Sequence, residues 1–218
     1  HGVDIPHLCY ADGLATAGNC RACVVEIEGE RVLAPSCCRA PTEGMKVSSD
    51  NERARRSQSL VLELLRGEVG DASHTQESEL DHWCERYELK RSRFGCRNQP
   101  AEDISHPAIA VNLESCIQCT RCVRACREEQ MNDVIGLAHR GGHAQIVFDL
   151  DDAMGASSCV GCGECVQACP TGALMPAGDV GMEAIDHKVD SVCPYCGVGC
   201  LLTYHVRDNR IRYVTGRD

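Results

Sequence analysis

Cys116-Ile-Gln-Cys-Thr-Arg-Cys-Val-Arg-Ala-Cys126 is the stretch that decides the fold of this 218-residue chain, and a second run from Cys159 to Cys169 repeats its spacing. Each run reads C-x2-C-x2-C-x3-C, a spacing with which thiolates hold 4Fe-4S clusters. Where two such runs occur together, the fourth cysteine of each run ligates the other cluster. The spacing therefore predicts two crossed ligand sets, Cys116, Cys119, Cys122 and Cys169 for one cluster and Cys159, Cys162, Cys165 and Cys126 for the other.

The two runs also match outside the sulfurs, at Val123 with Val166 and at Ala125 with Ala168. This internal repeat indicates a duplicated half-domain. We expect a two-cluster, ferredoxin-like α+β unit over residues 105–180, with a strand at 144–148 after a Gly141-Gly142 turn. His139 and His143 are expected at its surface. A zinc site, which favours two separated C-x2-C pairs, or a disulfide framework is the alternative for these eight cysteines.

The neighbours of the second run suggest how the ligand loop is shaped. Gly161 and Gly163 are expected to let backbone N–H groups approach the cluster, where hydrogen bonds help to set its potential. Pro170 follows the last cysteine and should end the ligand turn, whereas Arg127 stands at that place in the first run.

The composition limits the remaining possibilities. Eighteen cysteines, mostly in C-x2-C spacings, with one Trp, two Phe and five Tyr, favour metal ligands in a reducing compartment, which we take to be the cytoplasm. A net charge of −10 argues against nucleic acid as a partner. No run of about eighteen apolar residues is present, so we expect no membrane span.

Four further cysteines lie near the start, with the spacing C-x10-C-x2-C-x13-C; they are Cys9, Cys20, Cys23 and Cys37. Four thiolates suffice for a 2Fe-2S cluster, and we expect residues 1–48 to form a 2Fe-2S ferredoxin-like domain. A hairpin turning at Glu28-Gly29 should bring Cys37 back toward the ligand loop. Because the spacing differs from the plant-type pattern, zinc or a mixed site remains the alternative here.

This region resembles a known domain, in the segments Pro6–Cys9, Gly18–Cys23, Pro35–Cys37 and Glu43–Met45. It is similar to the N-terminal 2Fe-2S domain shared by the large iron–sulfur subunit of NADH:quinone oxidoreductase, iron-only hydrogenases and NAD-dependent formate dehydrogenases. The resemblance implies a 2Fe-2S cluster, with Cys37 rather than Cys38 as its fourth ligand. It also implies an upstream β-hairpin, so the chain is expected to be truncated at its front.

Residues 49–104 are expected to form a helical linker region. The first predicted helix, 49–67, would be capped by Ser49 or Asp50 and stopped by Gly67. Leu60, Val61, Leu64 and Leu65 would form its apolar stripe, and the arginines at 53, 55 and 56 a solvated face. A second helix is predicted over 76–89, through Leu80, Trp83 and Tyr87.

Two cysteines in this region have no partner motif. In the resembled families, the neighbourhood often holds a 4Fe-4S cluster with three cysteines and one histidine, but the ligand spacing is missing around His74. We therefore expect Cys84 and Cys96 to be structural thiols. A further cluster that combines them with a histidine is the alternative.

The last segment, 187–218, carries Cys193-Pro-Tyr-Cys196-Gly-Val-Gly-Cys200, a C-x2-C-x3-C motif, followed by a predicted hairpin from Leu201 to Val214 that turns at Asp208-Asn209. The motif resembles the opening of the 4Fe-4S domain of molybdopterin oxidoreductases of the formate dehydrogenase type. The resemblance implies a third 4Fe-4S cluster whose fourth ligand lies beyond Asp218, next to a Mo- or W-bis-pterin guanine dinucleotide. A zinc knuckle or free thiols are the alternative.

Together these resemblances imply the N-terminal iron–sulfur region of the catalytic (alpha) subunit of an NAD-dependent formate dehydrogenase. Electrons from formate would pass through the clusters to a flavin- and NAD-binding partner subunit. No residue here is a candidate catalytic acid, base or nucleophile, so the active site is expected outside this stretch. The rival interpretations are a subunit of NADH:quinone oxidoreductase, an iron-only hydrogenase, and a stand-alone ferredoxin-like carrier.

Overall fold

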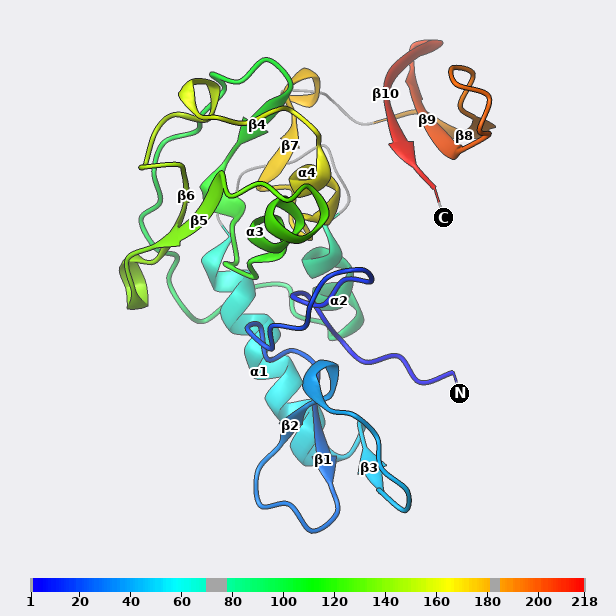
Figure 1. Cartoon of the computed structure of the whole chain (residues 1–218). Helices are drawn as coiled ribbons and strands as arrows, with labels where there is room; N and C mark the ends of the chain where they lie inside the picture. The colour runs from blue at the N-terminus through cyan, green and yellow to red at the C-terminus, as the bar shows by residue number, and fades with distance from the viewer. Residues whose placement is uncertain (1, 70–77, 181–184, 218) are drawn as a thin grey trace.

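The computed structural model describes residues 2–69, 78–180 and 185–217. The chain begins with a small three-stranded sheet, passes through two helices into a unit of short strands and helices, and ends in a second three-stranded sheet (Figure 1). This mixture of short helices and strands agrees with the α+β class predicted from the sequence. Within the described ranges, no helix is long and apolar enough to cross a membrane.

The first sheet has the order β2-β1-β3 and is antiparallel throughout. Its strands are β1 (Val24–Ile27), β2 (Ala34–Pro35) and β3 (Val47–Ser48). The turn between β1 and β2 contains Gly29, whose φ of +86° suits glycine. The predicted hairpin is thus confirmed, and it carries the chain directly into Cys37, which follows β2.

Helix α1 (Glu52–Glu68) differs from its prediction at both ends. Asn51 caps it, because its side-chain oxygen accepts a hydrogen bond from the Ala54 N–H at 2.8 Å; Ser49 and Asp50 do not cap it. Gly67 lies inside the last turn rather than after it. A Cβ at this position would lie 2.7 Å from the Ser92 hydroxyl oxygen, so Gly67 lets the segment after α2 pack closely.

The predicted stripe of α1 is borne out only in part. Val61 and Leu65 are partly buried against the core, whereas Leu60 and Leu64 are 42% and 43% exposed. Ala54, Gln58 and Leu62 face inward at four-residue intervals. Gln58 is buried because both ends of its amide are satisfied: it donates to the Val24 and Ser49 carbonyls and accepts from the Tyr87 hydroxyl. The arginines at 53, 55 and 56 lie on the exposed side, as predicted.

Helix α2 (Glu79–Arg86) is shorter than the predicted helix 76–89, of which residues 76 and 77 lie outside the described part. Ser78 caps it, and Leu80, Trp83 and Cys84 point into the core. That core also takes in residues from the 2Fe-2S-type loop, from α1 and from the first ligand run; its buried members are Leu8, Cys9, Cys20, Ala22, Leu62, Leu80, Trp83, Cys84, Ile117 and Cys119. The two helices therefore join the flanking domains through a shared core.

The irregular segment after α2 is fastened to α1. The Arg93 guanidinium donates to both carboxylate oxygens of Glu63 at 2.7 Å. These bonds lower the pKa of the Glu63 carboxyl to about 2. Glu63 therefore stays charged at neutral pH and holds the segment on the helix.

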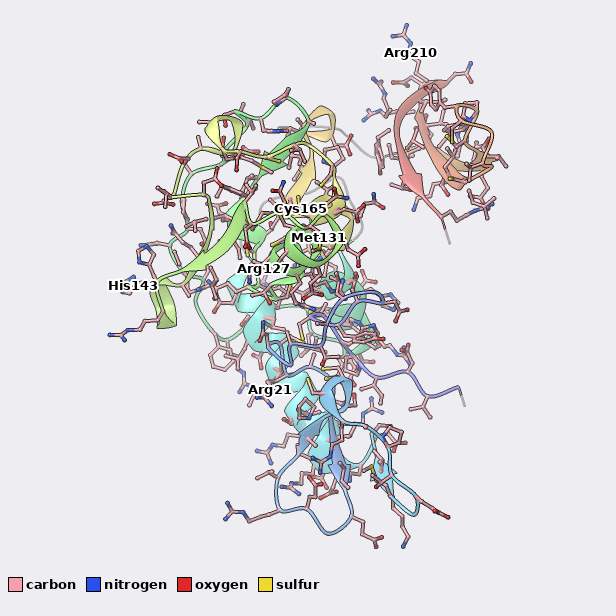
Figure 2. The ribbon with its side chains drawn as sticks, viewed as in Figure 1. Arg21, Arg127, Met131, His143, Cys165 and Arg210 are labelled. Atoms are coloured by element: carbon pink, nitrogen blue, oxygen red, sulfur yellow. The ribbon has the colours of Figure 1, made fainter. Side chains whose placement is uncertain are left out.

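The middle unit contains two antiparallel strand pairs, β4 (Ile109–Val111) with β7 (Leu174–Pro176) and β5 (Ile135–Ala138) with β6 (Gln145–Phe148). The prediction of a strand at 144–148 after the Gly141-Gly142 turn is confirmed by β6, whereas β4, β5 and β7 were not predicted. Short helices α3 (Arg121–Arg124) and α4 (Glu164–Ala168) pack against each other between the strand pairs. His139 and His143 are exposed as predicted, and His143 lies at the outer edge of the β5–β6 hairpin (Figure 2).

The last sheet has the order β10-β9-β8, with strands β8 (His187–Val192), β9 (Leu201–Arg207) and β10 (Arg210–Gly216). The predicted hairpin with its turn at Asp208-Asn209 is confirmed, and both turn residues have left-handed φ angles of 51° and 57°. Asparagine and aspartate tolerate this conformation, which matches the twist of a two-residue hairpin. The sheet forms a separate lobe beside the middle unit (Figure 1).

Candidate metal centres

The two C-x2-C-x2-C loops have the same backbone shape, which supports the internal repeat. In each loop the second residue after the first cysteine and the residue directly after the second cysteine have positive φ: Gln118 and Thr120 in one, Gly161 and Gly163 in the other. The N–H of Gln118 lies 3.4 Å from the Cys116 sulfur, and that of Gly161 lies 3.3 Å from the Cys159 sulfur. The second loop meets this geometry with glycine, and the first meets it with two residues that adopt the left-handed region at a cost.

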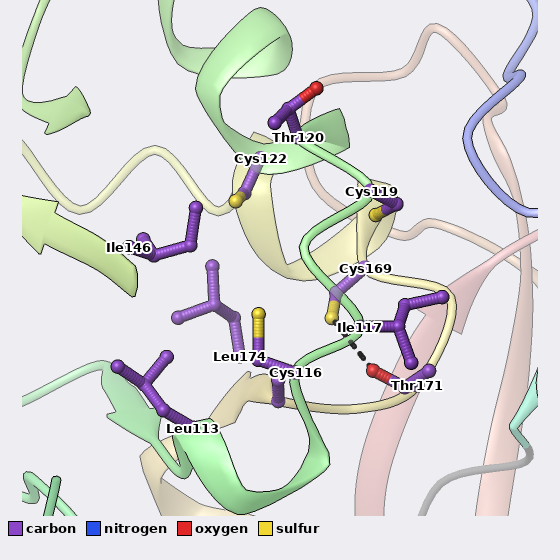
Figure 3. Close-up of a pocket in the computed structure, with 11 residues that line it drawn as sticks. Leu113, Cys116, Ile117, Cys119, Thr120, Cys122, Ile146, Cys169, Thr171 and Leu174 are labelled. Atoms are coloured by element: carbon purple, nitrogen blue, oxygen red, sulfur yellow. Dashed lines mark hydrogen bonds between the residues drawn. The ribbon is translucent and has the colours of Figure 1, made fainter. Parts of the chain in front are cut away.

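The fourth thiol beside the first run comes from the second run. Cys169 lies with Cys116, Cys119 and Cys122 around one small cavity of about 20 Å³ (Figure 3). Apolar side chains complete its wall, among them Leu113, Ile146 and Leu174. Burial raises the pKa of Cys116 to about 11 and that of Cys122 well above its usual range, and the neighbouring thiols add to both shifts.

A thiol of the first run likewise lies beside the second run. Burial raises the pKa of Cys165 to about 12, and the charges of Cys159, Cys162 and Cys126 raise it further, so Cys126 of the first run is among its neighbours. Cys126 and Cys165 both belong to the apolar core of the middle unit, which Cys116, Cys159 and Cys169 flank. The structure thus places Cys169 beside the first run and Cys126 beside Cys165 of the second run, while the crossed ligand assignment stays a prediction.

The chain leaves the two runs differently. After the first run it continues as a π-helical turn, Ala125–Glu129, whereas α4 ends at Ala168 before Pro170. Proline lacks an N–H and cannot continue a helix, while Arg127 can. As a result, Glu128 of the π-turn reaches the first domain, where its carboxylate accepts from the Ala15 N–H at 2.7 Å.

The four thiols of the first domain are close together in two pairs. A hydrogen bond between the Cys9 and Cys20 thiols lowers the pKa of Cys9 and raises the pKa of Cys20, so these two thiols are neighbours. Burial, followed by the neighbouring Cys23 thiol, raises the pKa of Cys37. Since the same loop brings both pairs together, these residues form a third four-thiol group.

Cys38 is exposed and lies beside this group, with its sulfur 3.6 Å from that of Cys37. Gly18, at φ +64°, leaves room for it, because a Cβ there would lie 2.9 Å from the Cys38 sulfur. The close packing explains why glycine precedes the Asn19-Cys20 turn. It also makes the choice between the two adjacent thiols testable.

We expect Cys37→Ala to abolish the EPR signal of the 2Fe-2S centre in anaerobically purified protein, and Cys38→Ala to leave it intact. Cys37 contacts Cys23, whereas Cys38 packs outward against Gly18. Iron content and the EPR spectrum of the reduced protein measure the difference. The reverse result, with the signal lost only in Cys38→Ala, would assign the ligand to Cys38.

The third motif forms a loop between β8 and β9 that the Cys193 N–H closes by donating to the Cys200 carbonyl at 2.8 Å. Gly197 and Gly199 in this loop both have positive φ. Cys193 is partly buried, while Cys196 and Cys200 are exposed. The three thiols are thus held in one closed loop between two paired strands.

Cys84 and Cys96 differ in their exposure to solvent. Cys84 is buried in the core beside Trp83, as expected of a structural thiol, and burial raises its pKa to about 11. Cys96 is exposed. His74 lies outside the described residues, so the alternative of a further cluster there stays untested.

The surroundings of the first-run thiols suit an iron–sulfur cluster. Together with Cys169 they border a cavity within an apolar shell, and the Gln118 N–H is directed at the Cys116 sulfur. Apolar surroundings and N–H donors to sulfur are the features that tune such clusters.

The sequence was not enough to identify the side chains that hold these groups against one another. Asn19 of the first domain donates to the Cys119 carbonyl at 3.4 Å and to the Thr120 hydroxyl at 2.7 Å. Arg121 and Arg124 on α3 make similar contacts in the opposite direction. The sequence feature that could have indicated these contacts is the position of Arg121 and Arg124, which lie between ligand cysteines and three residues apart on one helical turn.

Comparison with known proteins divides the chain into three matched parts. Residues 1–52 match a 2Fe-2S iron-sulfur cluster binding domain, residues 106–175 match the ferredoxin-like domain of NADH-quinone oxidoreductase subunit 3, and residues 186–218 match a molybdopterin oxidoreductase Fe4S4 domain. The thiols of the first domain fall in the first of these parts, both runs of four cysteines in the second, and Cys193, Cys196 and Cys200 in the third. The predicted boundaries 1–48, 49–104, 105–180 and 187–218 stay predictions.

Relatives align over nearly the whole chain. A subunit of the NADH-quinone oxidoreductase of Rhizobium meliloti is 33% identical, with 94% of this chain and 25% of the relative aligned. The alpha subunit of the NADPH-Fe(3+) oxidoreductase of Geobacter sulfurreducens is 32% identical, with 100% of this chain and 26% of the relative aligned. The chain therefore spans about a quarter of the length of these relatives.

A solved structure agrees with this placement. The crystal structure of an NAD+-reducing [NiFe]-hydrogenase in the H2-reduced state superposes with a TM-score of 0.73 at 26% identity, covering 79% of this chain and 75% of that one. In domain order and in sequence, the chain is thus similar to the iron–sulfur region of an NADH-quinone oxidoreductase subunit and of related molybdopterin oxidoreductases.

Proposed function

We propose that this chain is the electron-transfer iron–sulfur region of an NAD(P)-linked oxidoreductase. The observation that supports this most strongly is the placing of Cys169 beside the three thiols of the first run, around one apolar-walled cavity. Six of the eight thiols of the two runs lie in or against the apolar core of the middle unit, and Cys119 shares a second core with Cys9 and Cys20 of the first domain. Clusters bound there would supply one-electron carriers. The proposed ligands are Cys9, Cys20, Cys23 and Cys37 for a 2Fe-2S cluster, Cys116, Cys119, Cys122 and Cys169 for the first cubane, and Cys126, Cys159, Cys162 and Cys165 for the second.

In this function, the chain itself would set the spacing of the sites, their burial and the electrostatic surroundings of the sulfurs. Thiols with raised pKa give up protons when they bind metal, so cluster binding and deprotonation are linked. The buried apolar walls then limit water access, and the Gln118 and Gly161 N–H groups direct partial positive charge at sulfur. These features set how readily each site accepts an electron.

We further propose that the full-length enzyme is an NAD-dependent formate dehydrogenase. Its Cys193, Cys196 and Cys200 would hold a third cubane with a fourth ligand beyond Asp218. The matched molybdopterin oxidoreductase Fe4S4 domain at 186–218 supports a Mo or W bis-pterin centre in the continuation of the chain. The names of the relatives mention NADH and NADPH and so support an NAD(P)-binding partner subunit, which we propose also binds flavin. We place the enzyme in the cytoplasm, where thiols stay reduced.

Iron analysis and EPR of the anaerobically purified 218-residue chain test the first proposal. We expect about ten iron atoms, from one 2Fe-2S and two 4Fe-4S clusters, and about fourteen once the third cubane is complete in the longer protein. Reduction should give both 2Fe-2S and 4Fe-4S signals. A colourless protein that binds zinc, or one with its thiols in disulfides, would disprove the relay.

A second assay separates formate dehydrogenase from its rivals, and it uses the full-length protein with its partner subunits. Formate-dependent reduction of NAD supports our proposal. NADH oxidation coupled to reduction of a quinone would instead identify an NADH:quinone oxidoreductase. The similarity to a subunit of such an enzyme supports this alternative equally well. Hydrogen-dependent NAD reduction would identify a hydrogenase, and a native chain that ends near Asp218 would identify a stand-alone carrier.

A further inference from the structure

One helical turn connects the 2Fe-2S-type site to the first cubane site. Arg121 and Arg124 lie three residues apart on α3 and both reach the loop that follows Cys9. Arg121, which is 4% exposed, donates to the Tyr10 carbonyl and to both carboxylate oxygens of Glu79 at 2.6 and 3.0 Å. Its charge is therefore balanced by Glu79.

Arg124 differs because it joins two ligand cysteines. One of its terminal nitrogens, Nη2, lies 2.5 Å from the Cys9 carbonyl oxygen and 3.3 Å from the Cys119 carbonyl oxygen. The other, Nη1, donates to the Ala15 carbonyl at 2.5 Å. A single guanidinium thus holds the backbone of one proposed 2Fe-2S ligand against the backbone of one proposed cubane ligand.

The charge of this guanidinium has no carboxylate partner in the described part of the chain. All its contacts there are to neutral carbonyl oxygens, and its Nε is buried without a hydrogen-bond partner. Within the described residues, the cation therefore lies without a countercharge between the carbonyl groups of Cys9 and Cys119.

The electrostatic consequence is the same at both sites. Adding an electron to a cluster adds negative charge, which a nearby fixed cation stabilises, most strongly where the surroundings exclude water. A cation that contacts the ligands of two centres must therefore raise both potentials together. The second cubane site is not among its contacts and should feel it less.

We propose that Arg124 is a positioning residue whose single positive charge raises the reduction potentials of both the 2Fe-2S centre and the first cubane. The two potentials are thereby shifted in the same direction. This inference rests on the proposed function, because both sites must hold clusters. It assigns a role to a residue that is not itself a ligand. The second cubane serves as an internal reference.

The test is a potentiometric EPR titration of Arg124→Gln in the anaerobically purified chain. We expect the equilibrium constant for reduction to fall at least tenfold at both centres, which is 59 mV for a one-electron couple, and less than threefold at the second cubane. Repeating the titration in a Cys159→Ala background, which should lack the second cubane, identifies the signal of the first. Arg124→Lys keeps the charge and should keep both potentials within threefold.

Arg127→Gln is the matched control, because it removes the same charge from the following turn. The Arg127 side chain is 59% exposed and pairs with Asp133, so both potentials should stay within threefold of wild type. If Arg124→Gln does not retain its iron, the titration is repeated with Arg124→Met, which is also neutral and has an apolar side chain of similar length. Unshifted potentials in an iron-replete neutral variant, or a shift at only one centre, overturn the inference. A wild-type chain without clusters would overturn the proposed function instead.

Discussion

Cys169→Ala should remove the cubane of the first run and leave the cubane of the second run in place, although Cys169 belongs to the second run in sequence. The structure places Cys169 in the wall of the cavity that Cys116, Cys119 and Cys122 border. Losing one of four thiolates should release that cluster or leave it incomplete. The measurements are the iron content and the EPR spectrum of the reduced protein.

Double variants make the crossing explicit. If Cys116 and Cys169 serve the same cluster, Cys116→Ala and the pair Cys116→Ala/Cys169→Ala should both retain about six of about ten iron atoms, because only one cubane is lost in each. The pair Cys159→Ala/Cys169→Ala should retain about two, because it removes a ligand from both cubanes. Cys96→Ala, at an exposed thiol outside the groups, is the control and should retain about ten. Ligation without crossing would exchange the results of the two double variants.

The candidate cysteine groups could be proposed from the sequence because their information is local. Ligand spacings within eleven residues define a loop that can close around one cluster face, and the duplication of the run implies the exchange of the fourth cysteine. The hairpins at Gly29 and at Asp208-Asn209 were predictable for the same reason, since a turn is encoded by residues that can adopt positive φ. Gln118 and Thr120 adopt it too, and their side chains gave no sign of it.

The face of α1 was not predictable from apolar periodicity. Its inward positions are filled by Ala54 and Gln58 as well as Leu62, and an apolar pattern cannot recognise a glutamine whose amide is fully bonded in the core. Because Leu60 and Leu64 are apolar, they were assigned to the buried face, although both are exposed. Tertiary hydrogen bonds, which involve residues 9 to 34 positions away, decided the outcome.

The contacts between the domains were also beyond the sequence. Asn19 and Arg124 meet residues that lie 100 to 115 positions away in the chain. No periodicity or motif links such positions. The predicted helical linker therefore gave no indication that α1 and α2 share a core with residues of two cysteine loops.

Leu62→Ala should lower the free energy of unfolding by about 2–5 kcal/mol, the range found for leucines removed from packed cores. Leu62 is 0% exposed, and its core includes the cysteines of two centres, Cys9 and Cys119. A cavity there removes contacts from the wall behind both ligand loops. The variant should therefore lose its clusters at a lower urea concentration, which visible absorbance under anaerobic conditions reports, together with earlier loss of helix by circular dichroism.

Leu64→Ala is the matched control, since it makes the same change two residues further along the same helix. Leu64 is 43% exposed, so its replacement should cost less than about 1 kcal/mol. Equal effects of the two variants would contradict the shared core. If Leu62→Ala unfolded the helices before the visible absorbance fell, the cluster loops would be shown to stand independently of α1, because a common core requires that both signals are lost together.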